Sequence, residues 1–241
     1  EGVNPHTIFF KNHYTNDLRY PTAKEENLFA EKIRELNPHI VGLSVLSPYV
    51  SIARRLTRIV KNNSSASVIW GGIHPTLSPE ASIQEADMIC LGEGESALTD
   101  LVQLLRDGKD YQHVENLWSR NNGHIARNPM RPLSQDLDSI PFPAYARNSF
   151  YFIGSDQIIQ NDPTLLEPIL AIMPARGCPF RCTYCVNSLL KPMYKNMGHF
   201  NRRRSVPSVI AELKEVLAIA GNRQKIVEFH DEYFCIGEVC R

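Results

Sequence analysis

The chain has 241 residues, of which 43% are hydrophobic and 22% are charged, and its 26 basic residues balance its 26 acidic residues. This composition is typical of a soluble globular protein with one or two domains, and it excludes a strongly basic chain that binds nucleic acid through charge. No segment approaches the roughly 18 to 20 apolar residues of a membrane helix, so we expect neither a membrane nor a nucleic-acid partner.

Strand-like and helix-like segments alternate in the first half of the chain. The strand-like runs are short and rich in β-branched and apolar residues, and they cover residues 7–11, 40–45, 67–70 and 88–91. Apolar residues recur at helical spacing in residues 23–36, 51–62 and 98–105, and Ser78-Pro79-Glu80 favours the start of a further short helix. Strands separated by helices of this length indicate βαβ units and a parallel sheet.

The pattern changes after this first half. Asn121-Asn122-Gly123 lies between two short apolar runs and is typical of a hairpin turn. Prolines at positions 129, 132, 141 and 143 then favour a linker. We therefore expect an α/β domain at residues 1–127, a proline-containing linker at 128–165 and a second domain at 166–241.

The last part of the chain returns to an α/β pattern. It predicts strands at 169–173 and 226–229, with a helix at 205–220 that Ser205 caps and Gly221 ends. The run Arg202-Arg203-Arg204 is short and favours a solvated or phosphate-contacting loop.

Three of the six cysteines crowd into one short segment directly after the strand at 169–173. Cys178, Cys182 and Cys185 lie in the run Gly-Cys-Pro-Phe-Arg-Cys-Thr-Tyr-Cys, and thiolates are the preferred ligands of soft metals. A cubane [4Fe–4S] cluster held by three thiolates keeps one iron free to accept another ligand. Six cysteines are too few for a disulfide scaffold, so the cluster indicates a metal site in a reducing compartment, and we expect a cytoplasmic protein.

This CxxxCxxC motif resembles that of the radical S-adenosylmethionine (SAM) superfamily. The resemblance implies a [4Fe–4S] cluster on the three cysteines, which are then the catalytic and metal-binding residues, and SAM bound to the free iron. One-electron reduction then cleaves SAM to a 5′-deoxyadenosyl radical. The resemblance also implies that Tyr184 packs near the adenine, and that Asp231 and Glu232, which end the strand at 226–229, bind the SAM ammonium.

A structural zinc site is the alternative for the three cysteines. His199 is the best candidate for a fourth ligand, because Cys90, Cys235 and Cys240 do not form a close CxxC pair with the cluster. In that case the chain is a non-enzymatic module that binds zinc and, through its first domain, cobalamin or a nucleotide.

Small residues follow three of the strands expected in the first domain. They are Ser44, the pair Gly71-Gly72, and Gly92 with Glu93 beside it. Ligands of open parallel sheets bind at the carboxyl ends of the strands, where glycines allow a close approach to the backbone.

These stretches resemble the Rossmann-type cobalamin-binding domain that precedes many radical SAM enzymes. The resemblance implies that the five residues contact cobalamin, with Ser44 bonded to its base. The DxHxxG loop of cobalt-ligating members is absent, so neither His13 nor His74 is assigned to cobalt.

The expected fold is therefore α/β, with a doubly wound parallel sheet followed by the start of a partial (β/α) radical SAM barrel. Only two barrel strands are visible, and the strand at 7–11 looks like the second strand of the cobalamin-binding family, so we expect a chain shortened at both ends. The resemblance implies a cobalamin-dependent methyltransferase that acts on a small molecule and receives electrons from flavodoxin or ferredoxin. A cyclisation or rearrangement enzyme with a vestigial cobalamin domain is the alternative.

Overall fold

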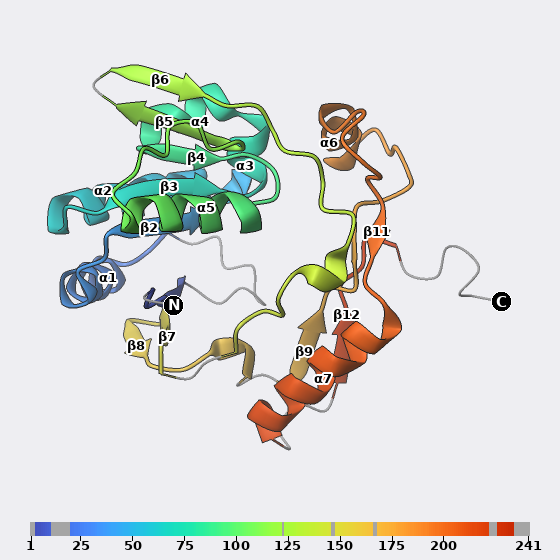
Figure 1. Cartoon of the computed structure of the whole chain (residues 1–241). Coiled ribbons are helices and arrows are strands. Elements are labelled where there is room, and N and C mark those ends of the chain that lie inside the picture. The colour runs from blue at the N-terminus through green and yellow to red at the C-terminus, as the bar shows by residue number, and fades with distance from the viewer. Residues whose placement is uncertain are drawn as a thin grey trace. The chain divides into compact units, whose positions relative to one another are not determined.

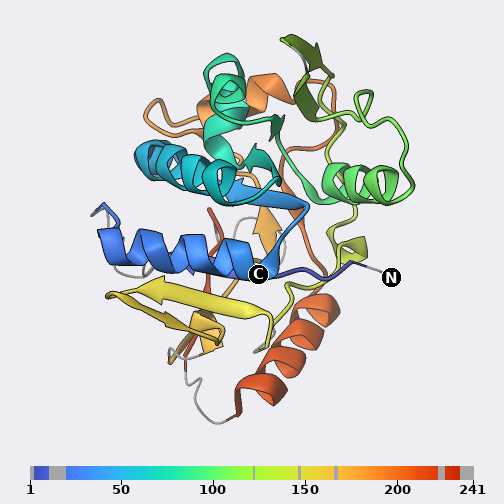
Figure 2. The ribbon, with the colours of Figure 1, turned by 90° about the vertical axis from the view of Figure 1, so that its left-hand side faces the viewer.

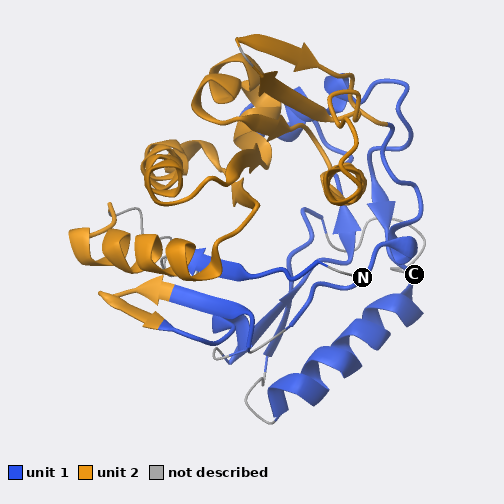
Figure 3. Cartoon of the chain, turned by 60° about the vertical axis from the view of Figure 1, so that its left-hand side comes forward, with its two compact units in different colours: residues 1–9, 132–152, 159–241 blue, residues 10–131, 153–158 orange. Residues whose placement is uncertain are grey.

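The computed structural model describes residues 3–10, 20–121, 123–145, 148–165, 168–221 and 226–233 of the chain. The chain forms two compact units, which Figure 3 distinguishes by colour. One unit holds residues 10–131 and 153–158, and the other holds residues 1–9, 132–152 and 159–241. His13 lies outside the described residues.

A five-stranded sheet forms the centre of the unit built mainly from residues 10–131 (Figure 1). Its strand order is β2-β3-β4-β5-β6, and the strands are β2 (Ile40–Ser44), β3 (Ser67–Gly71), β4 (Met88–Cys90), β5 (Leu117–Asn121) and β6 (His124–Arg127). The first three strands are parallel, whereas β5 runs antiparallel to β4 and β6 antiparallel to β5. The predicted parallel sheet and the predicted hairpin are thus both confirmed.

Helices cover both faces of this sheet. They are α1 (Ala23–Leu36), α2 (Val50–Asn63), α3 (Ile73–Leu77), α4 (Pro79–Glu85) and α5 (Glu95–Arg106), with a 3-10 turn, η1, at Ser47–Tyr49. Apolar side chains of α5 pack with Ile69 and Met88 in one buried cluster. On the other face, the indole of buried Trp70 donates a 2.9 Å hydrogen bond to Thr57 of α2. Neighbouring residues of β3 therefore contact helices on opposite faces of the sheet, as expected for a doubly wound sheet.

The helix boundaries follow local sequence signals. The predicted helix at 23–36 is confirmed without a shift, and it begins in a capping box, in which Thr22 and Glu25 bond each other's backbone N–H. Figure 2 shows α1 beside α2, and the Arg55 guanidinium of α2 lies 2.5 Å from Glu26 of α1. Within the described ranges, every helix is too short or too polar to cross a membrane.

A second, three-stranded sheet has the order β1-β7-β8. Its strands are β1 (Thr7–Phe10), β7 (Phe150–Gly154) and β8 (Gln157–Ile159). The strand predicted at residues 7–11 therefore exists in its described part, but it pairs with β7 and does not join the sheet of β2 to β6. Aromatic contacts between the strands, such as Phe9 with Phe150 at a centroid distance of 5.8 Å, favour this pairing.

The segment expected as a linker contains β7 and β8 as well as the 3-10 turns η2 (Leu137–Ser139) and η3 (Pro163–Leu165). Leu133, Leu137 and Leu165 of this segment are buried. Apolar side chains of the proline-rich part are therefore buried in the folded chain, so this part is not an exposed linker.

The unit that includes residues 159–241 is organised around two parallel strands, β9 (Ile169–Ile172) and β12 (Ile226–Phe229). Helix α7 (Val206–Ala220) connects them in sequence and buries Val209 and Val216 against Leu170 and Ile172. Ser205 caps α7 and Gly221 ends it, as predicted. The unit also holds α6 (Asn187–Met193) and the two-residue strands β10 (Ala175–Arg176) and β11 (Arg202–Arg203), which pair antiparallel.

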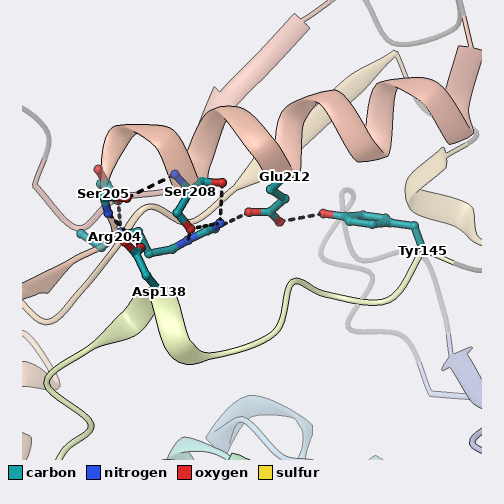
Figure 4. Close-up of polar contacts among 8 residues, drawn as sticks. Asp138, Tyr145, Arg204, Ser205, Ser208 and Glu212 are labelled. Atoms are coloured by element: carbon teal, nitrogen blue, oxygen red, sulfur yellow. Dashed lines mark hydrogen bonds and ion pairs between the residues drawn. The ribbon is translucent and has the colours of Figure 1, made fainter.

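The arginine run at residues 202–204 is only partly the solvated loop expected from the sequence, because Arg203 alone of the three is exposed. Arg202 is buried and donates a 2.8 Å hydrogen bond to the carbonyl of Ser134. The Arg204 side chain is 10% exposed and pairs with the 3% exposed carboxylate of Glu212, which also accepts from the Tyr145 hydroxyl (Figure 4). For Arg204 the expectation was wrong because α7 supplies a buried counter-charge that local sequence does not reveal.

Candidate functional site

The carboxyl ends of β9 and β12 meet at one edge of their sheet. The two strands pair in register from Ile226 opposite Ile169 to Phe229 opposite Ile172, and the N–H of His230 continues the ladder to Ile172 at 2.8 Å. The cysteine segment follows β9, and Asp231 and Glu232 follow β12. The parallel pairing therefore brings together the two groups of residues that the sequence singled out.

The acids touch the cysteine segment on both sides. Asp231 Oδ1 accepts a 2.9 Å hydrogen bond from the N–H of Ala175, three residues before Cys178. Glu232 Oε2 accepts a 2.6 Å hydrogen bond from the amide of Asn187, two residues after Cys185. Among the described residues, Asp231 Oδ2 is buried and has no hydrogen-bond partner. This second carboxylate oxygen is therefore unsatisfied within the part of the chain that the structure describes.

Gly177 places the backbone of the cysteine segment against residue 200. Its φ is +81°, and a Cβ at this position would lie 2.2 Å from the carbonyl oxygen of Phe200. Both the left-handed backbone and the close approach require glycine. The start of the cysteine loop is therefore held by a contact that no other residue type allows.

Lys191 of α6 is hydrogen-bonded to the backbone of the cysteine loop. Its ammonium donates hydrogen bonds to the carbonyls of Pro179 at 2.6 Å and Phe180 at 2.9 Å, and it lies over the ring of Phe200. These carbonyls directly follow Cys178, so one cation ties the middle of the loop to α6. The sequence contains no local signal for this role, because Lys191 lies eleven residues beyond Phe180.

The three cysteines differ in exposure. Cys178 is buried, Cys185 is half-buried and Cys182 is exposed, and a turn between Cys182 and Cys185 is closed by a 3.0 Å backbone hydrogen bond. Tyr184 between them is 91% exposed, and its hydrogen bond with Cys182 raises the pKa of the phenol. No three His, Cys, Asp or Glu side chains in the described part of the chain gather closely enough to hold one metal ion. His199 is exposed, and its backbone N–H pairs with Gln135 at 2.9 Å.

A second candidate site lies at the carboxyl edge of β2, β3 and β4. Ser44 ends β2 and is exposed, and Gly71 and Gly72 follow in β3 and directly after it. A Cβ on Gly72 would lie 3.2 Å from both the nitrogen and the oxygen of Val45, and its φ is +94°. Gly92 follows β4 with a φ of +65°. The three strand ends therefore present small residues and close-packed backbone at one edge, as the sequence predicted.

Glu93 and His74 flank this second edge. The carbonyl of Glu93 accepts a 2.8 Å hydrogen bond from the side chain of Asn116, a residue that the sequence did not single out. His74 Nδ1 lies 3.1 Å from the hydroxyl of Ser47, and burial together with the charge of Arg54 lowers the pKa of its imidazole.

The chain thus combines two features. One is an α/β sheet whose parallel strands end in small residues, and the other is a cysteine loop that lies between a strand and a helix. Residues 12–102 match the family model of the B12 binding domain. An uncharacterized methyltransferase of Pyrococcus horikoshii is 31% identical over 213 residues, which cover 87% of this chain and 43% of the relative. The first half of the chain is thus similar to B12 binding domains, and most of its length is similar to a methyltransferase.

Two further proteins are similar. The anaerobic magnesium-protoporphyrin IX monomethyl ester cyclase of Rubrivivax gelatinosus is 30% identical over 190 residues, which cover 74% of this chain and 31% of the cyclase. The radical SAM methyltransferase TsrM of Kitasatospora setae, solved with cobalamin and a [4Fe–4S] cluster, has the same fold over 86% of this chain and 40% of TsrM, with a TM-score of 0.62 and 19% identity. The chain spans less than half the length of each protein compared.

Proposed function

We propose that this chain carries the cofactor-binding part of a radical SAM enzyme. Residues 166–241 bind a [4Fe–4S] cluster and SAM, residues 1–127 bind cobalamin, and residues 128–165 link the two. The parallel pairing of β9 and β12 carries the proposal, because it joins Asp231 to the base of the cysteine loop. Ligands of parallel α/β sheets bind at such strand ends.

The chain's own residues fit a cluster with one open iron. Three thiolates on a single loop supply three soft ligands, and the described acids at the strand end are left for a bound cation rather than for iron. Gly177 and Lys191 hold the loop backbone in place. When bound, the reduced cluster supplies the electron that cleaves SAM.

Each proposed SAM contact has a physical basis. Oδ2 of Asp231, which has no hydrogen-bond partner among the described residues, accepts a hydrogen bond from the SAM ammonium, and Glu232 adds a second negative charge beside Asn187. The phenol ring of Tyr184 is almost fully exposed between two of the cysteines, where it packs on the adenine.

Cobalamin fits the edge formed by β2, β3 and β4. Ser44, Gly71, Gly72, Gly92 and Glu93 lie there, and the lack of bulky side chains leaves backbone groups open to the nucleotide tail. Ser44 hydrogen-bonds the base of that tail. His74 is again not assigned to cobalt.

Methyl transfer to a small molecule is the proposed reaction. The similarity to a methyltransferase of P. horikoshii and the match to a B12 binding domain favour it. The comparable similarity to the R. gelatinosus cyclase favours ring formation as the second candidate, with a vestigial cobalamin domain. In either case flavodoxin or ferredoxin supplies the electron, and the enzyme works in the cytoplasm, where thiolates stay reduced.

Anaerobic reconstitution with iron and sulfide tests the cluster. We expect a brown protein with about four irons per chain, as a [4Fe–4S] cluster requires, and Cys178→Ala should lose the colour while staying folded. A colourless protein that binds one zinc per chain, and whose Cys178→Ala variant unfolds in this region, would establish the zinc module instead.

Titration with hydroxocobalamin tests the other domain. Saturable one-to-one binding, seen as a shift of the corrinoid absorbance, supports the cobalamin-dependent enzyme. A chain that assembles the cluster but does not bind hydroxocobalamin has a vestigial domain, and that result favours the second candidate reaction.

A further inference from the structure

Thr76 is a buried polar residue between two of the strand-end loops of the cobalamin edge. It lies in α3, is 2% exposed, and its hydroxyl makes two hydrogen bonds. The hydroxyl donates to the carbonyl of Gly72 at 2.8 Å and accepts from the N–H of Gly92 at 2.9 Å. One side chain therefore joins the loop after β3 to the loop after β4.

The loop after β2 is tied into the same set of bonds. Val45, which follows Ser44, donates its N–H to the carbonyl of Gly71 at 2.8 Å, and its own carbonyl accepts from the N–H of His74 at 3.0 Å. Since a Cβ on Gly72 would already meet the Val45 backbone at 3.2 Å, the two loops have little room to move relative to each other. The spacing of all three loops thus depends on a continuous set of hydrogen bonds.

Asn116 holds the loop after β4 from the opposite side. It is 4% exposed and has a φ of +69°. Its side-chain amide donates to the carbonyl of Glu93 at 2.8 Å, and its side-chain oxygen accepts from the N–H of Arg131 at 2.6 Å. Its backbone carbonyl accepts from Leu91 at 2.8 Å. Gly92 and Glu93 are consequently fixed between Thr76 and Asn116.

We propose that Thr76 and Asn116 are positioning residues for cobalamin, which set the separation of the strand-end loops that receive its nucleotide tail. The inference rests on the cobalamin part of the proposed function. A hydroxyl can donate and accept at once, whereas the methyl of an isosteric valine removes the bond from the Gly92 N–H and leaves the Gly72 carbonyl only the 3.4 Å bond from the backbone N–H of residue 76. Neither residue touches the tail, so each acts through the backbone of the glycine loops.

The test compares hydroxocobalamin binding by the full chain and four variants. Thr76→Val removes both hydroxyl bonds and Thr76→Ser keeps them. Asn116→Gly retains the positive φ but removes the side-chain bonds. Thr99→Val is the matched control, because the Thr99 hydroxyl also bonds the carbonyl four residues earlier, at 2.8 Å, but joins no second loop.

We expect the dissociation constant to rise about tenfold for Thr76→Val and Asn116→Gly, and to stay within about twofold of wild type for Thr76→Ser and Thr99→Val. Thermal unfolding of each unliganded variant identifies any loss of folding. If the wild-type chain binds hydroxocobalamin and Thr76→Val or Asn116→Gly binds it with the same dissociation constant, the inference is overturned but the proposed cobalamin site is not. A well-folded wild-type chain that does not bind hydroxocobalamin overturns the proposed cobalamin site and the inference with it.

Discussion

The carboxylate of Asp231 accepts a hydrogen bond from the N–H of Ala175 at 2.9 Å, although the two residues are 56 positions apart in sequence. Ala175 lies between the end of β9 and Cys178, and Asp231 lies just beyond β12. One oxygen of the carboxylate therefore fixes the base of the cysteine loop, and the other is buried and has no hydrogen-bond partner among the described residues.

Asp231→Asn should separate loop structure from SAM binding. The asparagine keeps an oxygen for Ala175 but replaces the free carboxylate oxygen with an NH2 group, so the charge-assisted bond to the SAM ammonium is lost. We expect SAM affinity, measured by equilibrium dialysis of the reconstituted protein, to fall about tenfold while the iron content stays at the wild-type level.

The control for this prediction is Glu228→Gln. Glu228 lies in β12, three residues before Asp231, and its carboxylate pairs with His230 at 3.2 Å. Neutralising it should leave SAM affinity unchanged. Equal affinity in Asp231→Asn and wild type would show that the free oxygen of Asp231 does not bind SAM.

Gly177→Ala should prevent assembly of the cluster. The new methyl group would lie 2.2 Å from the carbonyl oxygen of Phe200, so the loop must move before the three thiolates can meet the iron. Gly123→Ala is a matched control, because Gly123 has a φ of +80° and a Cβ added there would meet no described atom within 4 Å. We expect iron content after reconstitution to fall severely in Gly177→Ala, and Gly123→Ala to lose only about 1 kcal/mol of stability. Equal iron content in the two variants would contradict this prediction.

Glu212→Ala should destabilise the region around α7. The change leaves the Arg204 guanidinium, whose side chain is 10% exposed, without its buried counter-charge (Figure 4). Removing one partner of a buried pair costs about 3 to 5 kcal/mol. Hydrogen exchange of the α7 amides measures this loss as a lower opening free energy.

An exposed glutamate on the same helix provides the control for Glu212→Ala. Glu215 lies three residues further along α7, and Glu215→Ala should change the opening free energy by no more than about 0.5 kcal/mol. Similar small losses in both variants would mean that the ion pair of Arg204 and Glu212 does not stabilise the helix.

Cys90 should make the sheet of β2 to β6 sensitive to alkaline pH. Burial, and secondarily the charge of Glu95, raises the pKa of its thiol from the ordinary 9.0 to about 11. Between these values the thiol is ionised in the unfolded chain but protonated in the folded one, so the free energy of unfolding falls as pH rises. A difference of about two pKa units corresponds to a fall of about 2 to 3 kcal/mol across this window.

Urea unfolding followed by the fluorescence of buried Trp70 measures this effect in reducing buffer. The loss of stability between about pH 9 and about pH 11 should be smaller in Cys90→Ala than in wild type, whatever the stability of the variant at neutral pH. Stability profiles that run parallel through this range would show that Cys90 is not the group responsible.

Many elements of this fold could be predicted from local sequence. The helix at 23–36 and the end of α7 at Gly221 agree with the structure because capping residues and apolar spacing act within one or two turns. Pairing over long distances could not be predicted in this way. Counting elements assigns the strand at residues 7–11 to the family's sheet, yet its described part pairs with β7, which begins at Phe150.

The order of residues alone indicates the candidate sites of this chain. The spacing of Cys178, Cys182 and Cys185, the acids at positions 231 and 232, and the glycines after three strands follow directly from the order of residues. The way in which these groups are held depends on contacts between distant segments. The contact of Gly177 with Phe200, the bonds of Lys191 to the cysteine loop and the bridge that Thr76 makes between two loops each join segments that strand pairing and packing bring together. A buried hydrogen bond depends on which groups meet in space, and that is settled by the burial of the whole core rather than by neighbours in sequence.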